Sequence, residues 1–324
     1  MIPLRDNIRS KNVPVVNNLL IGVNILVFLI QLTQGANEAR FVYTYGLVPA
    51  KFTHPALSAY FGTASNLFSL ISYMFLHGGF THILFNMWSL WIFGDNVEDR
   101  LGSLRYLGFY LAAGLISGLS HMALNMNSQV PTIGASGAVA GVMGAYFLLH
   151  PKAKILTLVP IIIIPWLFEI PAFIFLGLWF ALQFISAAGS HGSATGIAWW
   201  AHIGGFIAGM VLLKLIDRVP AAGLSQKIRS TTAKKTSHRL QMLHPGGKSG
   251  SLHLYDSLPI TAFEAMTGTS KYVTIPQGFR RRTLRVNVPP GIKEGNTLRL
   301  RGMGRTSNTG ERGDLYLTIQ FVAW

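Results

Sequence analysis

The 324-residue sequence contains no cysteine. This absence excludes structural disulfides, thiolate metal sites and catalysis by a cysteine nucleophile. Charge is also scarce, since 12% of the residues are Asp, Glu, Lys or Arg, whereas soluble domains average about 25%. Half of the residues are hydrophobic. Together, the low charge and the apolar composition indicate a membrane protein.

The few charges are unevenly distributed along the chain. Residues 1–219 carry 11 Lys and Arg against 7 Asp and Glu, and residues 220–324 carry 16 against 5. We therefore expect a membrane domain over 1–219. The segment 220–251, rich in Lys, Ser, Thr and Gly, is expected to be a linker, and 252–324 a small separate domain.

Apolar runs predict six membrane-spanning helices, at 15–33, 72–94, 104–124, 135–149, 171–187 and 198–216. The first run follows a basic start, and no small-residue cleavage site follows it closely. We therefore expect an uncleaved signal anchor. The stretch 155–170 is also apolar, but prolines interrupt it. It is either a re-entrant or interfacial loop, or part of one long kinked helix.

Basic residues mark alternate ends of these spans, and Lys and Arg favour the cytoplasmic side. They are Arg5, Arg9, Lys11, Arg100, Arg105, Lys152, Lys154, Lys214 and Arg218. The connections 125–134 and 184–197 contain no charge. With six spans, both termini are expected in the cytoplasm. The starts of spans two, four and six are then expected at the outer face.

A serine and a histidine open two of those three spans. Ser136 lies in the segment Gly134-Ala-Ser136-Gly137, and His202 precedes Gly204-Gly205. Polar groups at membrane depth are costly and are therefore functional candidates. A serine hydroxyl becomes a strong nucleophile when a base takes its proton, and His202 is the candidate base. The glycines allow the two helices to approach closely. The alternative is that they only pack helices and that Ser136 caps one.

The second span adds His82 and Asn86, which are four residues apart and share a helix face. Both can donate hydrogen bonds to a developing oxyanion, and the backbone N–H of Ser136 at a helix N-terminus is a third donor. The alternative is that His82 and Asn86 hold spans together through interhelical hydrogen bonds. His77 lies about one and a half turns earlier, which favours a structural or interfacial role.

Zinc binding is a second interpretation of the histidines. His77, His82 and His202 would need an acidic partner, but the outer ends of the spans contain no acid. Glu169, the one carboxylate inside an apolar run, is expected toward the opposite end. The sequence also contains no His-Glu-x-x-His motif. Serine chemistry without a metal or other cofactor is therefore favoured.

The segment 14–217 resembles the rhomboid family of intramembrane serine proteases. The resemblance rests on three motifs in the family's order, on spans two, four and six: His82-x-x-x-Asn86, Gly134-x-Ser136-Gly137 and Ala201-His202-x-Gly204-Gly205. The segments Trp91–Gly102 and Glu169–Ala172, with Gly177-Leu178-Trp179, also resemble the family, the latter two its bacterial members.

This resemblance implies a Ser136–His202 dyad without a carboxylate, and an oxyanion hole of His82, Asn86 and the Ser136 N–H. Gly134, Gly137, Gly205 and His77 would support the site. The implied reaction is hydrolysis of transmembrane protein substrates in a bacterial inner membrane, with the site opening outward and span five as a lateral gate. One departure concerns Ala140, where some members have an aromatic residue that packs on the catalytic histidine.

In the tail, apolar residues alternate with polar ones as in β-strands. They are Leu284, Val286, Val288, Leu298, Leu300, Leu315, Leu317, Ile319 and Phe321. With Pro289-Pro290-Gly291 and Gly313-Asp314, residues 252–324 resemble the C-terminal peptide-binding domain of DnaJ chaperones, without a J-domain. The resemblance implies an unfolded-peptide or protein partner. The basic Arg280-Arg281-Arg282 also suits anionic lipid headgroups, and no motif that reads nucleic acid is present.

We therefore expect an all-α polytopic membrane protein, a six-helix rhomboid-like bundle, followed by a small cytoplasmic all-β domain. The expected function is intramembrane serine endopeptidase, with a chaperone-like binding domain in the cytoplasm. The alternative is a catalytically silent membrane adaptor that binds client proteins through its C-terminal domain.

Overall fold

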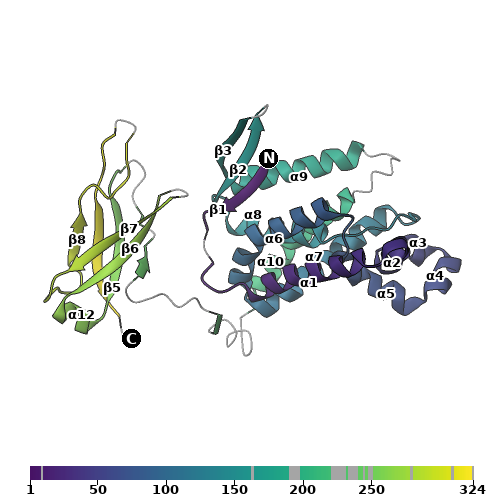
Figure 1. The fold of residues 1–324 in the computed structure, drawn as a ribbon, viewed down its shortest axis with the longest axis horizontal. Helices are drawn as coiled ribbons and strands as arrows, with labels where there is room; N and C mark the ends of the chain where they lie inside the picture. Colours follow the sequence, from purple (N-terminus) through teal and green to yellow (C-terminus); the bar gives the residue numbers. More distant parts are fainter. Residues whose placement is uncertain are drawn as a thin grey trace. The chain divides into compact units, whose positions relative to one another are not determined.

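The chain divides into two units, Met1–Lys234 and Lys235–Trp324. The first is mainly helical and the second is built from strands (Figure 1). The computed structural model describes residues 1–8, 10–161, 164–189, 198–219, 231–232, 240–243, 245–246, 251–277, 280–307 and 310–322. The predicted linker 220–251 lies largely outside these residues. One described part of it, Thr232, accepts a hydrogen bond from the N–H of Val13 at 2.8 Å, so it is attached to the first unit.

Each of the six predicted spans overlaps a helix of the first unit. These helices are α1 (Val15–Leu32), α6 (Phe80–Leu101), α7 (Ser103–Leu124), α8 (Ser136–Leu149), α9 (Ala172–Gly189) and α10 (Trp199–Asp217). Among the described helices, α1, α7, α9 and α10 are long and apolar enough to cross a membrane. A bent pair ending in α6 makes a fifth candidate. With 14 residues, α8 is shorter than the roughly 20 that span a bilayer.

Short helices fill the connection between α1 and α6. They are η1 (Gly35–Asn37), α2 (Glu38–Tyr45), α3 (Ala50–Thr53), α4 (Pro55–Phe61), α5 (Thr63–Ser72) and η2 (Tyr73–Phe75). The segment Thr63–Phe75 meets α6 at an angle of 78°. The break between them ends at Gly79, whose φ of 147° is a conformation that other residues rarely adopt. Helix α6 therefore begins at Phe80, eight residues after the predicted start, and His77 precedes it.

The stretch 155–170 forms a β-hairpin of β2 (Lys154–Ile161) and β3 (Ile164–Pro171). The prediction of one long kinked helix is therefore wrong. Pro160 and Pro165 lie opposite each other near the end of the hairpin, where strands tolerate a missing N–H better than a helix interior does. The N-terminal strand β1 (Ile2–Asp6) pairs antiparallel with β2 and completes a three-stranded sheet. Figure 1 shows this sheet at the opposite end of the unit from α2–α5.

Asp6 attaches this sheet to the helices. Its carboxylate accepts hydrogen bonds from the hydroxyl of Tyr146 at 2.5 Å and from the side-chain amide of Asn96 at 3.0 Å. Burial away from water raises the pKa of Asp6 to about 7, and the nearby Asp95 adds to the effect. The Tyr146 hydrogen bond acts in the opposite direction but is the smaller influence. The carboxyl group therefore holds its proton up to near-neutral pH.

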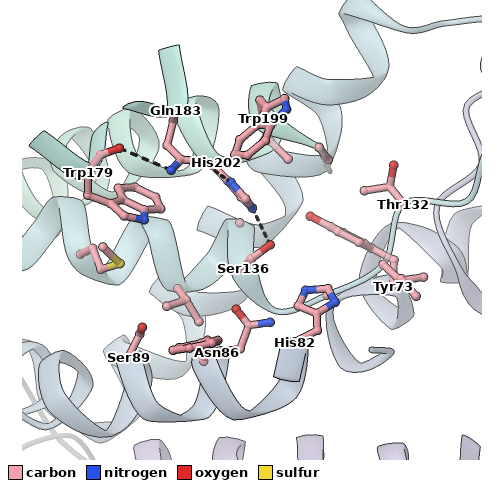
Figure 2. A pocket seen from close by; sticks show the side chains of 18 of the residues that line it. Tyr73, His82, Asn86, Ser89, Thr132, Ser136, Trp179, Gln183, Trp199 and His202 are labelled. Carbon is pink, nitrogen blue, oxygen red and sulfur yellow. Dashed lines mark hydrogen bonds between the residues drawn. The ribbon is translucent and has the colours of Figure 1, made fainter. Parts of the chain in front are cut away.

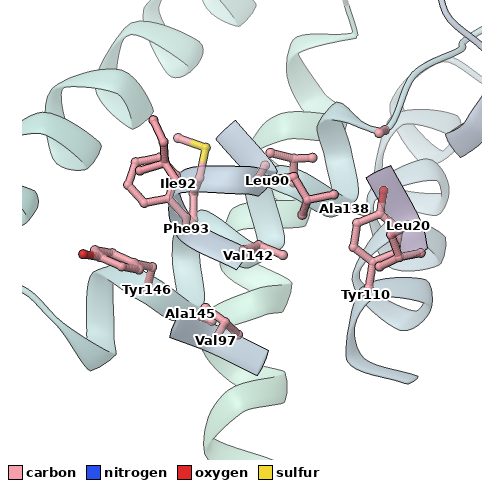
Figure 3. Packing of buried hydrophobic residues seen from close by; sticks show 14 of the residues in the cluster. Leu20, Leu90, Ile92, Phe93, Val97, Tyr110, Ala138, Val142, Ala145 and Tyr146 are labelled. Carbon is pink, nitrogen blue, oxygen red and sulfur yellow. The ribbon is translucent and has the colours of Figure 1, made fainter. Parts of the chain in front are cut away.

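Helix α8 lies at the centre of the hydrophobic core, and its residues Gly137–Tyr146 are all buried. Figure 3 shows Ala138, Val142 and Ala145 among side chains from α1, α6 and α7. On its other side, α8 contacts α10 through glycines. A Cβ added at Gly205 would overlap the carbonyl oxygen of Gly137, and one at Gly209 would overlap that of Gly141. Backbone thus packs directly on backbone, which brings the starts of the two helices together.

The described residues of the second unit form two three-stranded sheets, in the orders β4-β6-β7 and β5-β9-β8. The strands are β4 (Leu240–Met242), β5 (Leu254–Ile260), β6 (Thr269–Gln277), β7 (Arg280–Val288), β8 (Thr297–Leu300) and β9 (Leu315–Phe321), and α12 (Ala262–Thr267) follows β5. The predicted alternation is confirmed on β9, where Leu315, Leu317 and Ile319 are fully buried. Phe321, at the end of that strand, is 38% exposed and lies outside this core. The expected β-rich domain is therefore present.

Candidate active site

The structure brings Ser136 and His202 into direct contact. Ser136 is the first residue of α8, and His202 lies in the first turn of α10. The hydroxyl oxygen of Ser136 lies 2.8 Å from Nε2 of His202. The two residues are 66 positions apart in the sequence, so the glycine contact between α8 and α10 is what joins them. This is the geometry that a nucleophile and its base require.

A cavity of about 550 Å³ opens beside this pair. Its walls come from α6, from the segment before α8, and from α8, α9 and α10 (Figure 2). The predicted residues His82, Asn86, Gly134 and Gly137 all line it. The polar groups thus converge on one largely apolar pocket, the form that small substrate sites usually take.

His202 has a second partner, Gln183 on α9. Oε1 of Gln183 lies 2.8 Å from Nδ1 of His202, while Nε2 of Gln183 donates to the carbonyl oxygen of Trp179 at 3.4 Å (Figure 2). Since the amide nitrogen donates elsewhere, the amide oxygen faces the imidazole, and an acceptor at this position favours the tautomer with the proton on Nδ1 of His202. Nε2 is then free to accept the hydroxyl proton of Ser136.

The aromatic neighbours of His202 are residues that the sequence argument did not connect with the histidine. The ring centroids of Trp179 and Trp199 lie 6.0 Å and 6.1 Å from that of His202. At Ala140, some members of the family have an aromatic residue that packs on the histidine. In this chain Ala140 is fully buried within α8. Ala140 therefore does not leave the histidine without aromatic packing.

His82 lies on the opposite side of Ser136 from Gln183 (Figure 2). Its Nδ1 accepts a hydrogen bond from the backbone N–H of Gly78 at 3.3 Å. In the neutral ring the proton is therefore on Nε2. Gly134, with φ of 124°, lets the backbone pass close to this nitrogen, because a Cβ there would lie 2.7 Å from it and 3.7 Å from the Ser136 hydroxyl. The two histidines thus have opposite hydrogen-bonding roles near Ser136. His202 offers Nε2 as an acceptor, whereas His82 offers its Nε2–H as a donor.

Asn86 is the second polar residue on this side of the pocket. It is 6% exposed, and its Nδ2 has no hydrogen-bond partner among the described residues. Such groups are rarely left unpaired, since burial without a partner costs about 1–3 kcal/mol. The backbone N–H of Ser136, at the first position of α8, also lacks a partner within its helix. Both donors therefore remain available to a charge that forms in the pocket.

His77 lies behind His82 and outside the pocket wall. It is fully buried, and its ring packs edge-on against that of His82 with centroids 5.2 Å apart. Gln31 holds its backbone, accepting from the N–H at 3.1 Å and donating to the carbonyl at 2.7 Å. This environment agrees with the structural role that its position suggested.

Gln183 was missed by the sequence argument. A signal was present, because it is the most polar side chain in the apolar run of α9, and such residues are functional candidates by default. Its partner became visible only when α9 and α10 were placed together. Among the described residues, no group of three or more His, Cys, Asp or Glu is arranged to hold a metal ion.

The chain thus combines two kinds of domain. The first is an apolar helical bundle with a Ser–His pair beside a pocket, and the second is a β domain. Residues 64–218 match the Rhomboid domain, and residues 254–323 match the DnaJ C terminal domain. The chain therefore contains a rhomboid domain followed by a DnaJ C-terminal domain, which confirms both resemblances.

Similar proteins support both halves. Rhomboid protein 1, mitochondrial, of Saccharomyces cerevisiae is 29% identical over 201 residues, covering 59% of this chain and 50% of that protein. Rhomboid protease GluP of Bacillus subtilis is 28% identical over 220 residues, covering 67% and 38%. Chaperone protein DnaJ of Treponema denticola is 34% identical over 77 residues, covering 24% and 20%. The matched stretches thus span half or less of the length of these relatives.

Proposed function

We propose that this protein is an intramembrane serine endopeptidase that cuts transmembrane protein substrates. The observation that carries the proposal is the 2.8 Å contact between the Ser136 hydroxyl and Nε2 of His202 inside the pocket. Similarity to rhomboid proteins, one of them named a protease, supports the same reaction class.

The geometry suggests each step. The Ser136 oxygen attacks the peptide carbonyl carbon while its proton moves to Nε2 of His202. The tetrahedral oxyanion then accepts hydrogen bonds from His82, Asn86 and the Ser136 N–H, and such a donor is typically worth about 3 kcal/mol. His202 gives its proton to the leaving amine, and the peptide bond breaks. A water molecule, deprotonated by His202, hydrolyses the acyl-enzyme and restores Ser136.

The orientation of the domain forms part of this proposal: both termini in the cytoplasm and the pocket open to the outer face. Arg100 at the end of α6 pairs with Asp217 at the end of α10, at 3.1 Å, so these ends lie together. They are the opposite ends of the helices from His82 and His202. Because the chain has no cysteine, single substitutions test this directly. A membrane-impermeant maleimide added to intact cells should label Gln129→Cys and spare Lys152→Cys.

For the C-terminal domain we propose binding of an extended peptide or protein segment. The DnaJ C terminal match over 254–323 supports this role. The sheets end in strands such as β8 and β7, whose outer edges suit pairing with an added strand. Unfolded model peptides should bind the full chain more tightly than a variant that lacks the domain, whereas equal affinities would contradict the role.

The catalytic proposal is tested with a fluorophosphonate probe and a model transmembrane substrate. We expect the wild-type protein to be labelled and to cut, and Ser136→Ala and His202→Ala to do neither. Cleavage that persists in Ser136→Ala would show that the dyad is wrong. Absence of labelling and cleavage in the wild type, with peptide binding intact, would favour the silent adaptor instead.

A further inference from the structure

Gln183 is a buried polar residue, and catalysis by a Ser–His pair does not by itself explain its presence. It is 7% exposed and lies on α9, whose other residues are almost all apolar. Its amide makes two hydrogen bonds in opposite directions: Nε2 donates to Trp179 one turn earlier, and Oε1 accepts from Nδ1 of His202 at 2.8 Å. The first bond orients the amide, and the second orients the imidazole.

The contact is made at the ring nitrogen that does not touch Ser136. In a Ser-His-Asp triad, a carboxylate accepts from that same nitrogen, fixes the tautomer and stabilises the imidazolium. In the described part of this chain, the partners of the His202 ring are Gln183 and Ser136, and no carboxylate is among them. A neutral amide can fix the tautomer, but it stabilises the imidazolium less than a carboxylate would.

We propose that Gln183 is a positioning residue that holds His202 in the Nδ1-protonated tautomer and aims Nε2 at the Ser136 hydroxyl. The consequence for activity rests on the proposed function, whereas the effect on the tautomer does not. Because Gln183 lies on α9 and the dyad lies on α8 and α10, a displacement of α9 would remove the acceptor from His202. The competence of the base therefore depends on the position of this helix.

The competing explanation is that Gln183 only joins α9 to α10. A joining role predicts a loss of stability when Gln183 is replaced, with no change in the protonation behaviour of His202. A positioning role predicts a change at His202 itself. His82 and His121 are the other titratable groups that act on His202, and both stay constant across the variants below.

The experiment compares Gln183→Leu, Gln183→Glu and a control, Leu182→Ala, in the full chain. Leu182 is the neighbouring residue on α9 and is 50% exposed. Two quantities are measured: the rate of fluorophosphonate labelling as a function of pH, and the tautomer of His202 from ¹⁵N NMR, assigned with His202→Ala. The NMR readout needs no enzymatic activity.

We expect Gln183→Leu to label about 10- to 100-fold more slowly, the range for losing a hydrogen bond to a group that becomes charged, and to populate the Nε2-protonated tautomer. Gln183→Glu should keep the Nδ1-protonated form and move the acid limb of the pH profile to higher pH, because a carboxylate favours the imidazolium. Leu182→Ala should match the wild type in both readouts.

An unchanged tautomer in Gln183→Leu would overturn the positioning role, and so would an equal loss of labelling in Leu182→Ala. An acid limb that does not move in Gln183→Glu would also count against it. If the wild type is not labelled but the tautomer depends on Gln183, the proposed function fails while the positioning role stands.

Discussion

Replacing Asn86 with leucine should separate activity from stability. The Asn86 Nδ2 group is buried without a partner among the described residues, an arrangement that costs about 1–3 kcal/mol. Leucine removes that donor and adds apolar surface to a site that is 6% exposed. We therefore expect the free energy of unfolding to stay constant or to rise by about 1 kcal/mol.

Catalysis should change in the opposite direction. Loss of one oxyanion donor typically costs about 10²- to 10³-fold in kcat, or roughly 3–4 kcal/mol of transition-state stabilisation. The assay is cleavage of a model transmembrane substrate in detergent, with KM and kcat determined separately. KM should change little, because the donor acts on charge that is present only in the transition state. Thermal unfolding of the same preparation supplies the stability measurement.

Asn17 provides the matched control. It is fully buried, but its amide donates to the carbonyl of Leu90 at 3.1 Å and accepts from the hydroxyl of Tyr106 at 2.8 Å, away from the pocket. Asn17→Leu should therefore destabilise the fold by about 2 kcal/mol or more while the folded protein retains its kcat. If Asn86→Leu instead behaves like Asn17→Leu, Asn86 is an interhelical hydrogen-bonding residue and the oxyanion assignment is refuted.

Two further predictions concern the framework of the site. Gly209→Ala should abolish labelling of Ser136 and destabilise the fold by about 3 kcal/mol, because the added Cβ would overlap the Gly141 carbonyl. The control is Gly177→Ala, where the added Cβ would meet open space. This variant should be labelled normally and gain about 1 kcal/mol of stability. The pKa of Asp6 is about 7 in the folded state and about 4 in the unfolded state. Between these values the folded protein binds one more proton than the unfolded protein, so the free energy of unfolding should fall as pH rises from about 4 to 7. Asp6→Asn should remove that dependence and, at about pH 8, be more stable by at most about 4 kcal/mol in thermal unfolding; an unaltered pH profile would contradict the burial argument.

The sequence predicted the helices well because long apolar runs leave few alternatives, and it placed each of six spans on a helix. It was less accurate where the backbone turns. The start of α6 moved to Phe80 because Gly79 adopts a conformation closed to helices. The stretch 155–170 forms a hairpin, and its strand β2 also pairs with β1 from the distant N-terminus. A local pattern does not contain such a partner.

The candidate site shows the same division. Ser136, His202, His82 and Asn86 were found from residue type and spacing, since polar groups at helix ends in apolar runs are few. Gln183 was missed because a single glutamine in a helix indicates no specific role until the residue that it contacts is known. The aromatic neighbours of His202 were missed for the same reason, since they come from α9 and from the start of α10.

The sequence by itself determined which chemical groups are present, the apolar helices that carry them, and the separate β domain. It also supplied the glycines, but a glycine only permits close approach and does not choose a partner. The tertiary structure decided the rest. Packing of α8 on α10 set the 2.8 Å contact between Ser136 and His202. It also placed an acceptor, the Gln183 amide oxygen, at Nδ1 of His202 and a donor, the Gly78 N–H, at Nδ1 of His82. A hydrogen bond depends on distance and direction, and only the folded chain fixes these.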